Sequence, residues 1–456
     1  MSHLLIIGGS DAGINAALRA REMDSLMDIS VLIADRFPNY SICGLPFYLS
    51  GEVPDWQTLA HRTIEEIERQ AIHLLLDHRA VDIDPKAKMV TAENKRETRS
   101  LQYDKLIIAT GAVSALPAIA GMDLPGVFAL RWIGDGFIID RYMGEHHPES
   151  AIILGSGYIG MEMADALTRK GLSVTVLSRS GHILAAMDPE LGDIIRRELS
   201  KHGVRMIDRV DVTAIEKKNR KLIVRNSREI PLESDMILVA TGIRPESALA
   251  EKAGVSTGIH KAIRVSRTME TNIKDIYAAG DCVETWHRLL NKTTYFPLGT
   301  TAHKQGRVAG ENAAGGSQEF AGTLGTQVVK IFDLVVARTG LLDKEAMEAG
   351  FDPLTVKLEA WDHKVYYPGA SPLHICLTGD RKTNRLLGAQ MIGSYKAEVS
   401  KRIDILATAL FNGMTVESLN HLDLSYTPPL SSPWDPVQLI AQAWTLEHKR
   451  AKTARK

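Results

Sequence analysis

The chain contains 456 residues, carries a formal net charge of −1, and is 45% hydrophobic and 24% charged. A chain of this length has room for roughly three domains, each with its own core. The even balance of charges excludes the strong positive field that is typical of nucleic-acid and anionic-membrane binding. We therefore expect small molecules as partners, with no nucleic acid and no membrane.

The three cysteines, Cys43, Cys282 and Cys376, are widely spaced, and no two of them form a CxxC pair. This spacing excludes a disulfide framework and a zinc cluster, so no metal site is expected, and it favours a reducing compartment. The stretch "MSHLLIIGGSDAG" predicts a strand and a glycine turn rather than a signal peptide. No segment approaches the ~20 apolar residues of a transmembrane helix. The cytoplasm is the expected location.

One sequence pattern occurs twice. "HLLIIGGSDAGINAALRAREM" at 3–23 returns in altered form as "SAIILGSGYIGMEMADALTRKG" at 150–171. Each copy predicts an apolar strand, a glycine turn and a helix, and each is followed by a strand that ends in ATG, at 105–112 and 236–243. The pattern predicts an α/β fold with two Rossmann-like dinucleotide-binding units. Two nucleotides in one chain indicate electron transfer.

The glycine turns follow the GxGxxG spacing, in which the first glycine permits the turn, the second lets a pyrophosphate approach, and the third allows close packing. The second copy satisfies all three positions, whereas the first has serine in the middle. The alternative, a glycine turn between packed elements, is improbable for two copies with matching ATG strands. The cofactor-binding residues predicted from the turns and the ATG strands are Gly8, Ser10, Asp11, Gly13, Thr110, Gly111, Gly155, Gly157, Tyr158, Ile159, Gly160 and Gly242.

The residues at the end of the next strand distinguish the two nucleotides. Asp35, followed by Arg36, ends the first copy's second strand, where an acid accepts hydrogen bonds from a ribose. Ser178 and Arg179 stand at the matching place in the second copy and can bind a 2′-phosphate. We therefore expect NADPH at the second unit, with NADH as the alternative. Arg179 as a solvated surface charge is the other interpretation.

The segment "TNIKDIYAAGDCVE" at 271–284 resembles the second flavin-binding segment of the pyridine nucleotide-disulfide oxidoreductases. The resemblance covers essentially the whole chain. It implies that Gly280 and Asp281 contact FAD and that the first unit binds FAD and the second NAD(P)H. The expected domains are FAD-binding at 1–120 and 245–322, NAD(P)H-binding at 121–244, and dimerisation at 323–445.

The stretch "NYSICGLPFYLSG" at 39–51 resembles the single-cysteine branch of this family, which contains coenzyme A disulfide reductases, persulfide reductases, NADH oxidases and peroxidases. The resemblance implies that Cys43 meets the flavin and is redox-active. A helix beginning near Pro46 would lower the pKa of a thiol at its N-terminus. A buried, inert cysteine is the alternative. Cys282 and Cys376 are expected to pack in the core.

The segments "KVYYPGASPLHICL" at 364–377 and "KRIDILATALFNGMTVESLNHLDLSYTPP" at 401–429 resemble the dimerisation domain of coenzyme A disulfide reductases and persulfide reductases. The resemblance implies a homodimer in which Tyr366 or Tyr367, and Tyr426, reach over the partner's active cysteine. The phenols would donate hydrogen bonds to a leaving thiolate. The alternative is that they only pack a turn at the interface. The basic stretch 446–456 is expected to be disordered.

Three departures from the family bear on the substrate, and one of them is a connection from Asp35 to Cys43 that is two residues shorter than expected. Coenzyme A disulfide reductases usually have asparagine before the thiol, whereas this chain has Ile42. Asp11 stands where oxidases of the branch often carry histidine, and its carboxylate would relay protons, raise the pKa of the thiol by repulsion, or cap the following helix. Arg19 and Arg21 lie on the helix where relatives bind the nucleotide end of the substrate, although isolated helix arginines are more often solvated.

These features together predict a cytoplasmic, homodimeric, FAD-dependent NAD(P)H oxidoreductase. NADPH would place its nicotinamide near Glu162. Cys43 would form a mixed disulfide or persulfide with a small substrate, with coenzyme A disulfide or coenzyme A persulfide favoured. The alternatives are an NAD(P)H oxidase or peroxidase that acts through a Cys43 sulfenic acid, and a flavin-binding redox sensor with vestigial catalysis.

Overall fold

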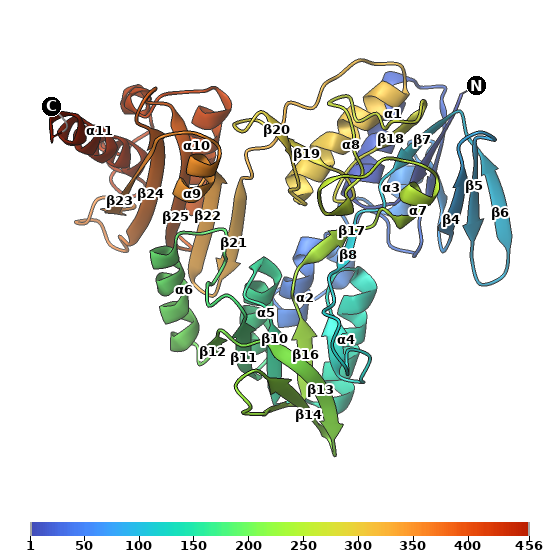
Figure 1. The fold of residues 1–456 in the computed structure, drawn as a ribbon, viewed down its shortest axis with the longest axis horizontal. Helices are drawn as coiled ribbons and strands as arrows, with labels where there is room; N and C mark the ends of the chain where they lie inside the picture. The colour runs from blue at the N-terminus through green and yellow to red at the C-terminus, as the bar shows by residue number, and fades with distance from the viewer. Residues whose placement is uncertain (1, 455–456) are drawn as a thin grey trace.

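The computed structural model describes residues 2–454 and contains three units, each built on a five-stranded sheet. The N-terminal unit lies to the right in Figure 1, the central unit below, and the C-terminal unit to the left. The predicted α/β class with two Rossmann-like units is confirmed, since two of the three sheets are parallel. Within residues 2–454, no helix combines the length and apolar character needed to cross a bilayer.

The N-terminal unit contains a parallel sheet in the order β18-β7-β1-β2-β3. Parallel strands place their carboxyl ends at one edge, where ligands bind in folds of this kind. The elements are β1 (His3–Ile7), α1 (Asp11–Met23), β2 (Asp28–Leu32), α2 (Leu45–Ser50), α3 (Ile64–Glu68), β3 (His73–Leu75), β4 (Arg79–Asp84), β5 (Met89–Glu93), β6 (Thr98–Gln102), β7 (Lys105–Ile108), β8 (Ala112–Ser114), β17 (Ile243–Pro245), α7 (Ala248–Lys252), β18 (Ile276–Ala278), β19 (Thr285–His287), β20 (Lys292–Thr294) and α8 (Gly299–Ala313).

The central unit repeats the parallel pattern in the order β12-β11-β10-β16-β9, and an antiparallel sheet of β13, β14 and β15 accompanies it. Its elements are β9 (Val127–Ala129), α4 (Ile133–His146), β10 (Ser150–Leu154), α5 (Tyr158–Arg169), β11 (Ser173–Ser178), α6 (Pro189–Lys201), β12 (Arg205–Asp208), β13 (Val212–Lys218), β14 (Lys221–Asn226), β15 (Leu232–Ser234) and β16 (Met236–Val239).

The C-terminal unit is an antiparallel sheet in the order β21-β22-β25-β24-β23 with helices beside it. Its elements are β21 (Gln327–Ile331), β22 (Leu334–Gly340), α9 (Asp343–Glu348), β23 (Pro353–Trp361), β24 (Pro372–Asp380), β25 (Leu386–Ser394), α10 (Val399–Phe411) and α11 (Pro436–Ala454). Short 3₁₀ turns occupy Ile42–Gly44, Trp56–Leu59, Ile259–Lys261 and Glu417–His421.

One hydrophobic cluster joins the three units at the place where the site forms. Leu45 and Leu49 of α2 are fully buried and belong to the same cluster as Met161 of α5 and Ile331 of β21. Burial of each such side chain contributes about 1.5–3 kcal/mol. The helix after Cys43 and the helix that carries Glu162 are therefore held in fixed relation.

The prediction that residues 446–456 are disordered is wrong for residues 446–454, which the structure describes as helical. Helix α11 continues to Ala454, and residues 455–456 lie outside the description. Trp444 is 1% exposed and donates a hydrogen bond from its indole to the carbonyl of Leu354. The ring of His448 is buried and stacks on Trp444. These contacts hold α11 against the C-terminal sheet. The helix therefore continues through the basic residues that follow His448, as far as Ala454.

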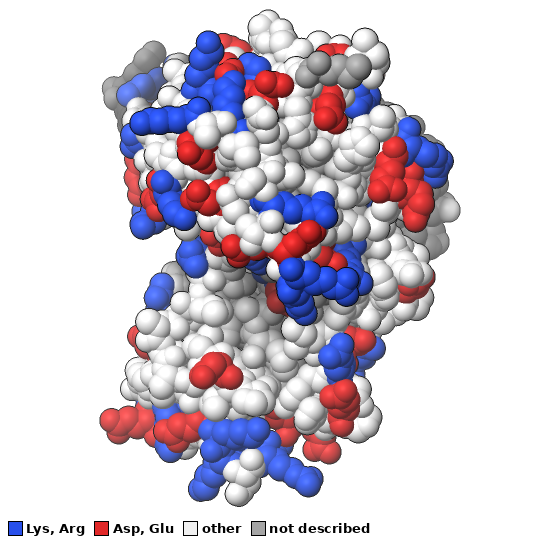
Figure 2. All heavy atoms as spheres, turned by 90° about the vertical axis from the view of Figure 1, so that its right-hand side faces the viewer, with Lys and Arg blue, Asp and Glu red and all other residues white. Residues whose placement is uncertain are grey.

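The surface carries both signs of charge. In the view of Figure 2, lysine and arginine side chains alternate with aspartate and glutamate across the face of the molecule. This distribution agrees with the net charge of −1.

Candidate functional site

Cys43 lies in the 3₁₀ turn Ile42–Gly44, immediately before α2, which begins at Leu45 close to the predicted Pro46. Cys43 is exposed, whereas Cys282 and Cys376 are buried. A Cβ on Gly44 would lie 2.5 Å from a methyl carbon of Leu59, so the turn is held against its neighbour. The backbone thus fixes the place of the one accessible thiol among the described residues.

The electrostatics at Cys43 differ from the expectation of a lowered thiol pKa. The protein around Cys43 desolvates the thiol and raises its pKa, and the carboxylates of Glu162 and Asp11 raise it further. Arg131 opposes this effect, and Asp281 adds to it. Helix α2 has only six residues, so its dipole is weak against three carboxylates. The carboxylates hold Cys43 toward the thiol form.

Glu162 has the most informative titration in the site. Burial, reinforced by the negative charge of Asp165, raises the pKa of Glu162 to about 7. A group with such a pKa exchanges protons near neutral pH, which suits general acid–base work. Helix α5 presents Glu162 close enough to Cys43 for the two to interact electrostatically.

The glycine turns show which positions the protein itself requires. A Cβ on Gly8 would lie 2.1 Å from the carbonyl oxygen of Ala109, and one on Gly13 would lie 1.9 Å from that of Gly8. The second turn repeats this, with 2.3 Å at Gly155 and 2.2 Å at Gly160. These glycines are therefore required for packing in both units.

The middle position behaves differently. A Cβ on Gly157 would meet no protein atom within 4 Å, so packing places no demand on glycine there. Open space in front of the α5 N-terminus is what close approach of a pyrophosphate requires. The residues of the second unit therefore fit a dinucleotide. Tyr158 and Ile159 begin α5 directly behind this space, and Gly242 has a positive φ of 114° beyond the adjacent β16.

In the first unit, Ser10 is the residue before α1 and makes no side-chain capping bond. Asp35 accepts a hydrogen bond from the backbone of Phe37 at 2.8 Å, and burial raises its pKa. Arg36 pairs with Asp77 at 2.5 Å and is exposed. Asp35 thus remains at the carboxyl edge of the sheet, as the ribose prediction requires, whereas the charge of Arg36 is already paired.

Asp281 is held by an arginine that the sequence analysis missed. The Arg131 guanidinium lies 2.6 Å from the Asp281 carboxylate, and the hydroxyl of Tyr295 donates to the Asp281 carbonyl at 2.9 Å. Arg131 stands between Leu130 and Trp132 in the sequence and belongs to no motif. Gly280 donates from its backbone to the side chain of Gln305 at 3.1 Å.

The neighbouring ATG strand lies in the same region. The Thr110 hydroxyl donates to the carbonyl of Glu246 at 2.5 Å, and Gly111 has a positive φ of 71°. The strands β7 and β18 pair in parallel, so Gly111 and Asp281 leave the sheet at the same edge. This edge also carries Gly8, because β1 pairs with β7.

Asp11 is the first residue of α1 rather than its cap. Burial raises the pKa of the Asp11 carboxyl, while His61 and His303 act in the opposite direction. The His61 ring lies 3.9 Å from the Asp11 carboxylate. The sequence analysis missed both histidines, because the chain brings them to Asp11 from the segments before α3 and on α8.

The two residues predicted to bind a 2′-phosphate have different surroundings. Ser178 is 1% exposed, and its hydroxyl is bonded to the Ser156 hydroxyl at 2.9 Å and to the backbone of Gly181 at 3.2 Å. Ser178 is therefore engaged within the protein and is not presented to a ligand. Arg179 is exposed and forms no salt bridge among residues 2–454. Arg209 lies beside Gly181 in the same corner.

The structure brings together two of the three predicted tyrosines. Partial desolvation and then a hydrogen bond with Tyr366 raise the pKa of Tyr426. Tyr367 instead faces the ring of His363, at 5.9 Å between centroids. All three are exposed, and none contributes to the electrostatics of Cys43 within the chain.

The arginines expected near the nucleotide end of the substrate are engaged inside the protein. Arg19 pairs with Glu22 at 2.8 Å and with Glu311 at 2.6 Å. Arg21 donates to backbone carbonyls, among them those of Gln70 and Ala71. Neither guanidinium is left as a free cation.

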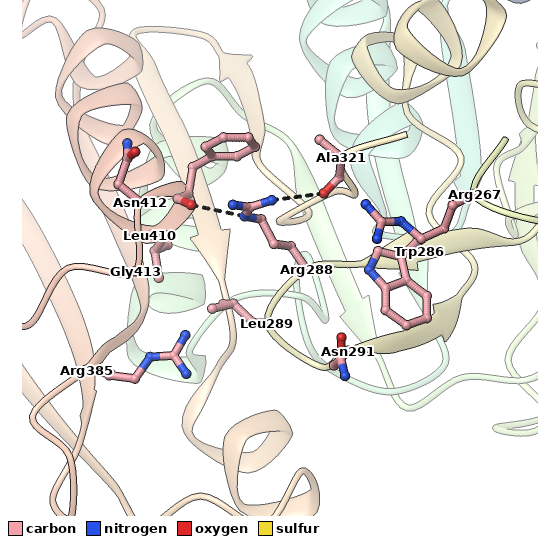
Figure 3. A pocket seen from close by; sticks show the side chains of 11 residues that line it. Arg267, Trp286, Arg288, Leu289, Asn291, Ala321, Arg385, Leu410, Asn412 and Gly413 are labelled. Carbon is pink, nitrogen blue, oxygen red and sulfur yellow. Dashed lines mark hydrogen bonds between the residues drawn. The ribbon is translucent and has the colours of Figure 1, made fainter. Parts of the chain in front are cut away.

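A cavity of about 490 Å³ lies away from these residues, between β19 and the end of α10. Figure 3 shows Arg267, Arg288 and Arg385 around it. Arg288 donates to the carbonyls of Phe411 at 3.0 Å and Ala321 at 3.2 Å and stacks on the Phe411 ring. Arg288 therefore joins the N-terminal and C-terminal units, and none of the predicted site residues lines the cavity.

Comparison with known families identifies the class of protein. The family model described as pyridine nucleotide-disulphide oxidoreductase matches residues 2–306. The chain belongs to this family. The model of the dimerisation domain of the pyridine nucleotide-disulphide oxidoreductases matches residues 326–436. Enzymes of this family use FAD and NAD(P)H. The family assignment, the enzyme class and the cofactors predicted from the sequence are confirmed.

Individual relatives cover nearly the whole chain. An NAD(P)H sulfur oxidoreductase (CoA-dependent) of Pyrococcus furiosus is 34% identical over 96% of this chain and 98% of its own. A coenzyme A disulfide reductase of Staphylococcus haemolyticus is 30% identical over 96% and 98%, respectively. The solved structure of an NAD-dependent persulfide reductase from A. fulgidus superposes with a TM-score of 0.94 at 36% identity, covering 99% of this chain and 84% of that one. This pyridine nucleotide-disulphide oxidoreductase is thus similar to enzymes that act on small sulfur compounds.

Proposed function

We propose that this oxidoreductase reduces a low-molecular-weight disulfide or persulfide through a single redox-active cysteine, Cys43. The observation that carries the proposal is that the one exposed thiol among the described residues interacts electrostatically with carboxylates of both dinucleotide units, Glu162 of the central unit and Asp11 and Asp281 of the N-terminal unit. Relatives named for coenzyme A, sulfur and persulfide substrates support coenzyme A disulfide or coenzyme A persulfide as the first candidates.

The chemistry at Cys43 needs no second protein thiol. The Cys43 thiolate attacks one sulfur of the substrate disulfide, the substrate S–S bond breaks, and one thiolate leaves while a mixed disulfide forms. When bound, FAD and NAD(P)H supply the two electrons that return the mixed disulfide to two thiols. Overall, one disulfide, two electrons and two protons give two thiols.

Two groups of the chain can manage the protons. Glu162, with a pKa of about 7, can exchange a proton near neutral pH, and its charge acts on the Cys43 thiol. Asp11 has His61 within 3.9 Å and is the second carboxylate that interacts with Cys43. The raised pKa of the Cys43 thiol makes such a proton acceptor necessary, since the thiolate is the nucleophile.

The active site of this proposal is completed by a second copy of the chain. Tyr366 and Tyr426 of one chain would lie over Cys43 of the partner subunit and donate hydrogen bonds to the departing thiolate. The match to a dimerisation domain supports a homodimer. The exposure of both tyrosines, 74% and 45%, supports a surface that a partner covers.

NADPH is the proposed reductant rather than NADH. Arg179 is an exposed guanidinium at the end of β11, where the ribose of a bound dinucleotide lies in this fold, and Arg209 adds a second cation beside Gly181. Two guanidinium groups suit a 2′-phosphate, which they bind through charge-assisted hydrogen bonds.

The test is anaerobic oxidation of NADPH by the FAD-loaded protein with coenzyme A disulfide as the acceptor, in wild type and in Cys43→Ser. We expect turnover in wild type and none in Cys43→Ser, with reduction of FAD by NADPH retained in both. Cys282→Ser is the matched control, because Cys282 is fully buried. Undiminished turnover in Cys43→Ser contradicts the proposal. Rapid NADPH consumption in air without a disulfide would instead favour the oxidase alternative.

A further inference from the structure

Two loops of the C-terminal unit carry the tyrosines of the proposed function. The loop over residues 362–371 joins β23 to β24 and carries Tyr366. The loop over residues 422–435 precedes α11 and carries Tyr426. The loops touch through the backbone of Lys364, which donates to the carbonyl of Pro428 at 3.3 Å, and Tyr366 lies close enough to Tyr426 to raise its pKa.

One buried side chain links the bases of both loops. Arg402, on α10, is 6% exposed. Its Nη2 donates to the carbonyl of Asp362 at 2.7 Å and to that of Leu430 at 3.2 Å. Its Nη1 donates to the carbonyl of Ala397, two residues before α10. A single guanidinium thus ties the helix to one backbone atom of each tyrosine-bearing loop.

Both loops carry internal hydrogen bonds beside their contacts with Arg402. The backbone of Asp362 donates to the carbonyl of Ser371 at 3.0 Å, and the Asp362 carboxylate accepts from the backbone of Ser371 at 2.9 Å. In the second loop, the hydroxyl of Ser431 donates to the Asp435 carboxylate at 2.8 Å. Arg402 therefore contacts the first loop at its closed base and the second loop at Leu430, next to Ser431.

The burial of the Arg402 guanidinium lowers the stability of the fold more than a purely structural contact would require. Arg402 Nε is buried without a hydrogen-bond partner and lies 3.8 Å from the Asp435 carboxylate. A buried charge with incomplete pairing destabilises a fold relative to an apolar side chain of the same size. The planar guanidinium is, however, the one side chain that reaches three carbonyls in a fixed geometry.

We propose that Arg402 is a positioning residue that holds Tyr366 and Tyr426 in register, so that both phenols are presented together to the partner's Cys43. This inference rests on the proposed function of the tyrosines. Arg402 acts through the two loops, since its own guanidinium is buried beneath them. Lysine at this position keeps the charge but has neither the planar fork nor the reach to both loops.

The test compares four FAD-loaded homodimers: wild type, Arg402→Lys, Tyr366→Phe/Tyr426→Phe, and the combination of all three substitutions. Turnover with NADPH and coenzyme A disulfide is measured beside the rate at which NADPH reduces the flavin. We expect Arg402→Lys to lower kcat for the disulfide by about 10- to 100-fold, as misplacement of positioned groups does, and to leave flavin reduction unchanged. In the double-phenylalanine background, Arg402→Lys should lower kcat no further.

The matched control is Arg381→Lys. Arg381 lies in the same unit and also has a buried Nε without a partner, but it pairs with Asp352 and touches neither loop. If Arg402→Lys lowers kcat by the same factor with and without the tyrosines, or behaves as Arg381→Lys does, the positioning role is wrong. If the double-phenylalanine protein itself turns over as wild type does, the proposed function of the tyrosines fails, and the inference fails with it.

Discussion

The Arg131 guanidinium lies 2.6 Å from the Asp281 carboxylate, and both side chains are largely buried, at 13% and 14% exposure. The pair joins the segment after β9 to the segment after β18, so it spans the two dinucleotide-binding units. Arg131 is also the cation that lowers the pKa of Cys43 against three carboxylates. One ion pair therefore affects both the fold and the reactivity of the thiol.

Arg131→Met should destabilise the protein by about 3–5 kcal/mol, because it leaves the buried Asp281 carboxylate without its partner. The same change should slow alkylation of Cys43, since the thiol pKa rises when the cation is lost. Urea unfolding and the rate of reaction with iodoacetamide measure the two effects. Arg131→Lys, which keeps the charge, is the control and should retain most of the stability and most of the alkylation rate. Equal losses of stability and rate in the two variants would contradict the electrostatic account.

Glu162→Gln should speed alkylation of Cys43 by about two- to tenfold at pH 8, because it removes a negative charge that raises the pKa of the thiol. Glu162 has a pKa of about 7, so it is ionised above neutral pH and protonated below. The difference between variant and wild type should therefore be large at pH 8 and shrink as the pH falls below 7. Glu145→Gln, on the exposed surface of α4, should leave the alkylation profile unchanged. A difference that does not vary with pH would be inconsistent with titration of Glu162.

Arg179→Ala should raise KM for NADPH by about 10- to 100-fold and leave KM for NADH unchanged, because only the former carries the 2′-phosphate. Steady-state kinetics with each nucleotide, at fixed coenzyme A disulfide, measures the ratio. Arg205→Ala removes an exposed arginine from the neighbouring strand β12 and should change neither KM. An equal rise of KM for both nucleotides would show that Arg179 does not bind the 2′-phosphate.

Asp165→Ala should cost about 3 kcal/mol of stability. The Asp165 carboxylate is 5% exposed and contacts Arg169 at 2.5 Å, Lys330 at 3.4 Å and the backbone of Phe332 at 2.8 Å. Its loss leaves the buried backbone N–H of Phe332 without its acceptor and removes the buried carboxylate that pairs with Arg169 and Lys330 between α5 and the C-terminal unit. Glu52→Gln removes a more exposed partner of the same lysine and should cost less than about 1 kcal/mol. Urea unfolding measures the free energy of unfolding of both variants. Similar losses of stability in Asp165→Ala and Glu52→Gln would argue against a role for Asp165 in joining the units.

The fold could be predicted from the sequence because its signals are local. Gly8 and Gly155 each begin a turn in which a Cβ would collide with a backbone carbonyl, so the motif reports a steric requirement that any chain with this packing must meet. The apolar strands before these turns are buried in parallel sheets, as their composition indicates. Neither inference needs knowledge of distant contacts.

The electrostatics of the site could not be predicted in the same way. Arg131 pairs with a residue 150 positions away, and His303 approaches Asp11 from α8, so only the folded chain brings them together. The pKa of Cys43 is raised first by desolvation and then by the balance of four charged groups, whereas the sequence pointed only to the helix that follows the thiol and to Asp11. The C-terminal residues are helical because Trp444 and His448 are buried in the C-terminal unit, and this burial could not be predicted from the sequence of the tail.

The different burial of the three cysteines makes the protein convenient for spectroscopy. Burial raises the pKa of Cys282 to about 11 and that of Cys376 to about 12, and both side chains are almost completely inaccessible. A thiol-directed reagent should therefore label the native chain once, at Cys43, without any cysteine being removed by mutagenesis. A fluorine tag placed there would give a single NMR resonance and would test whether nucleotide binding and subunit association change the surroundings of Cys43.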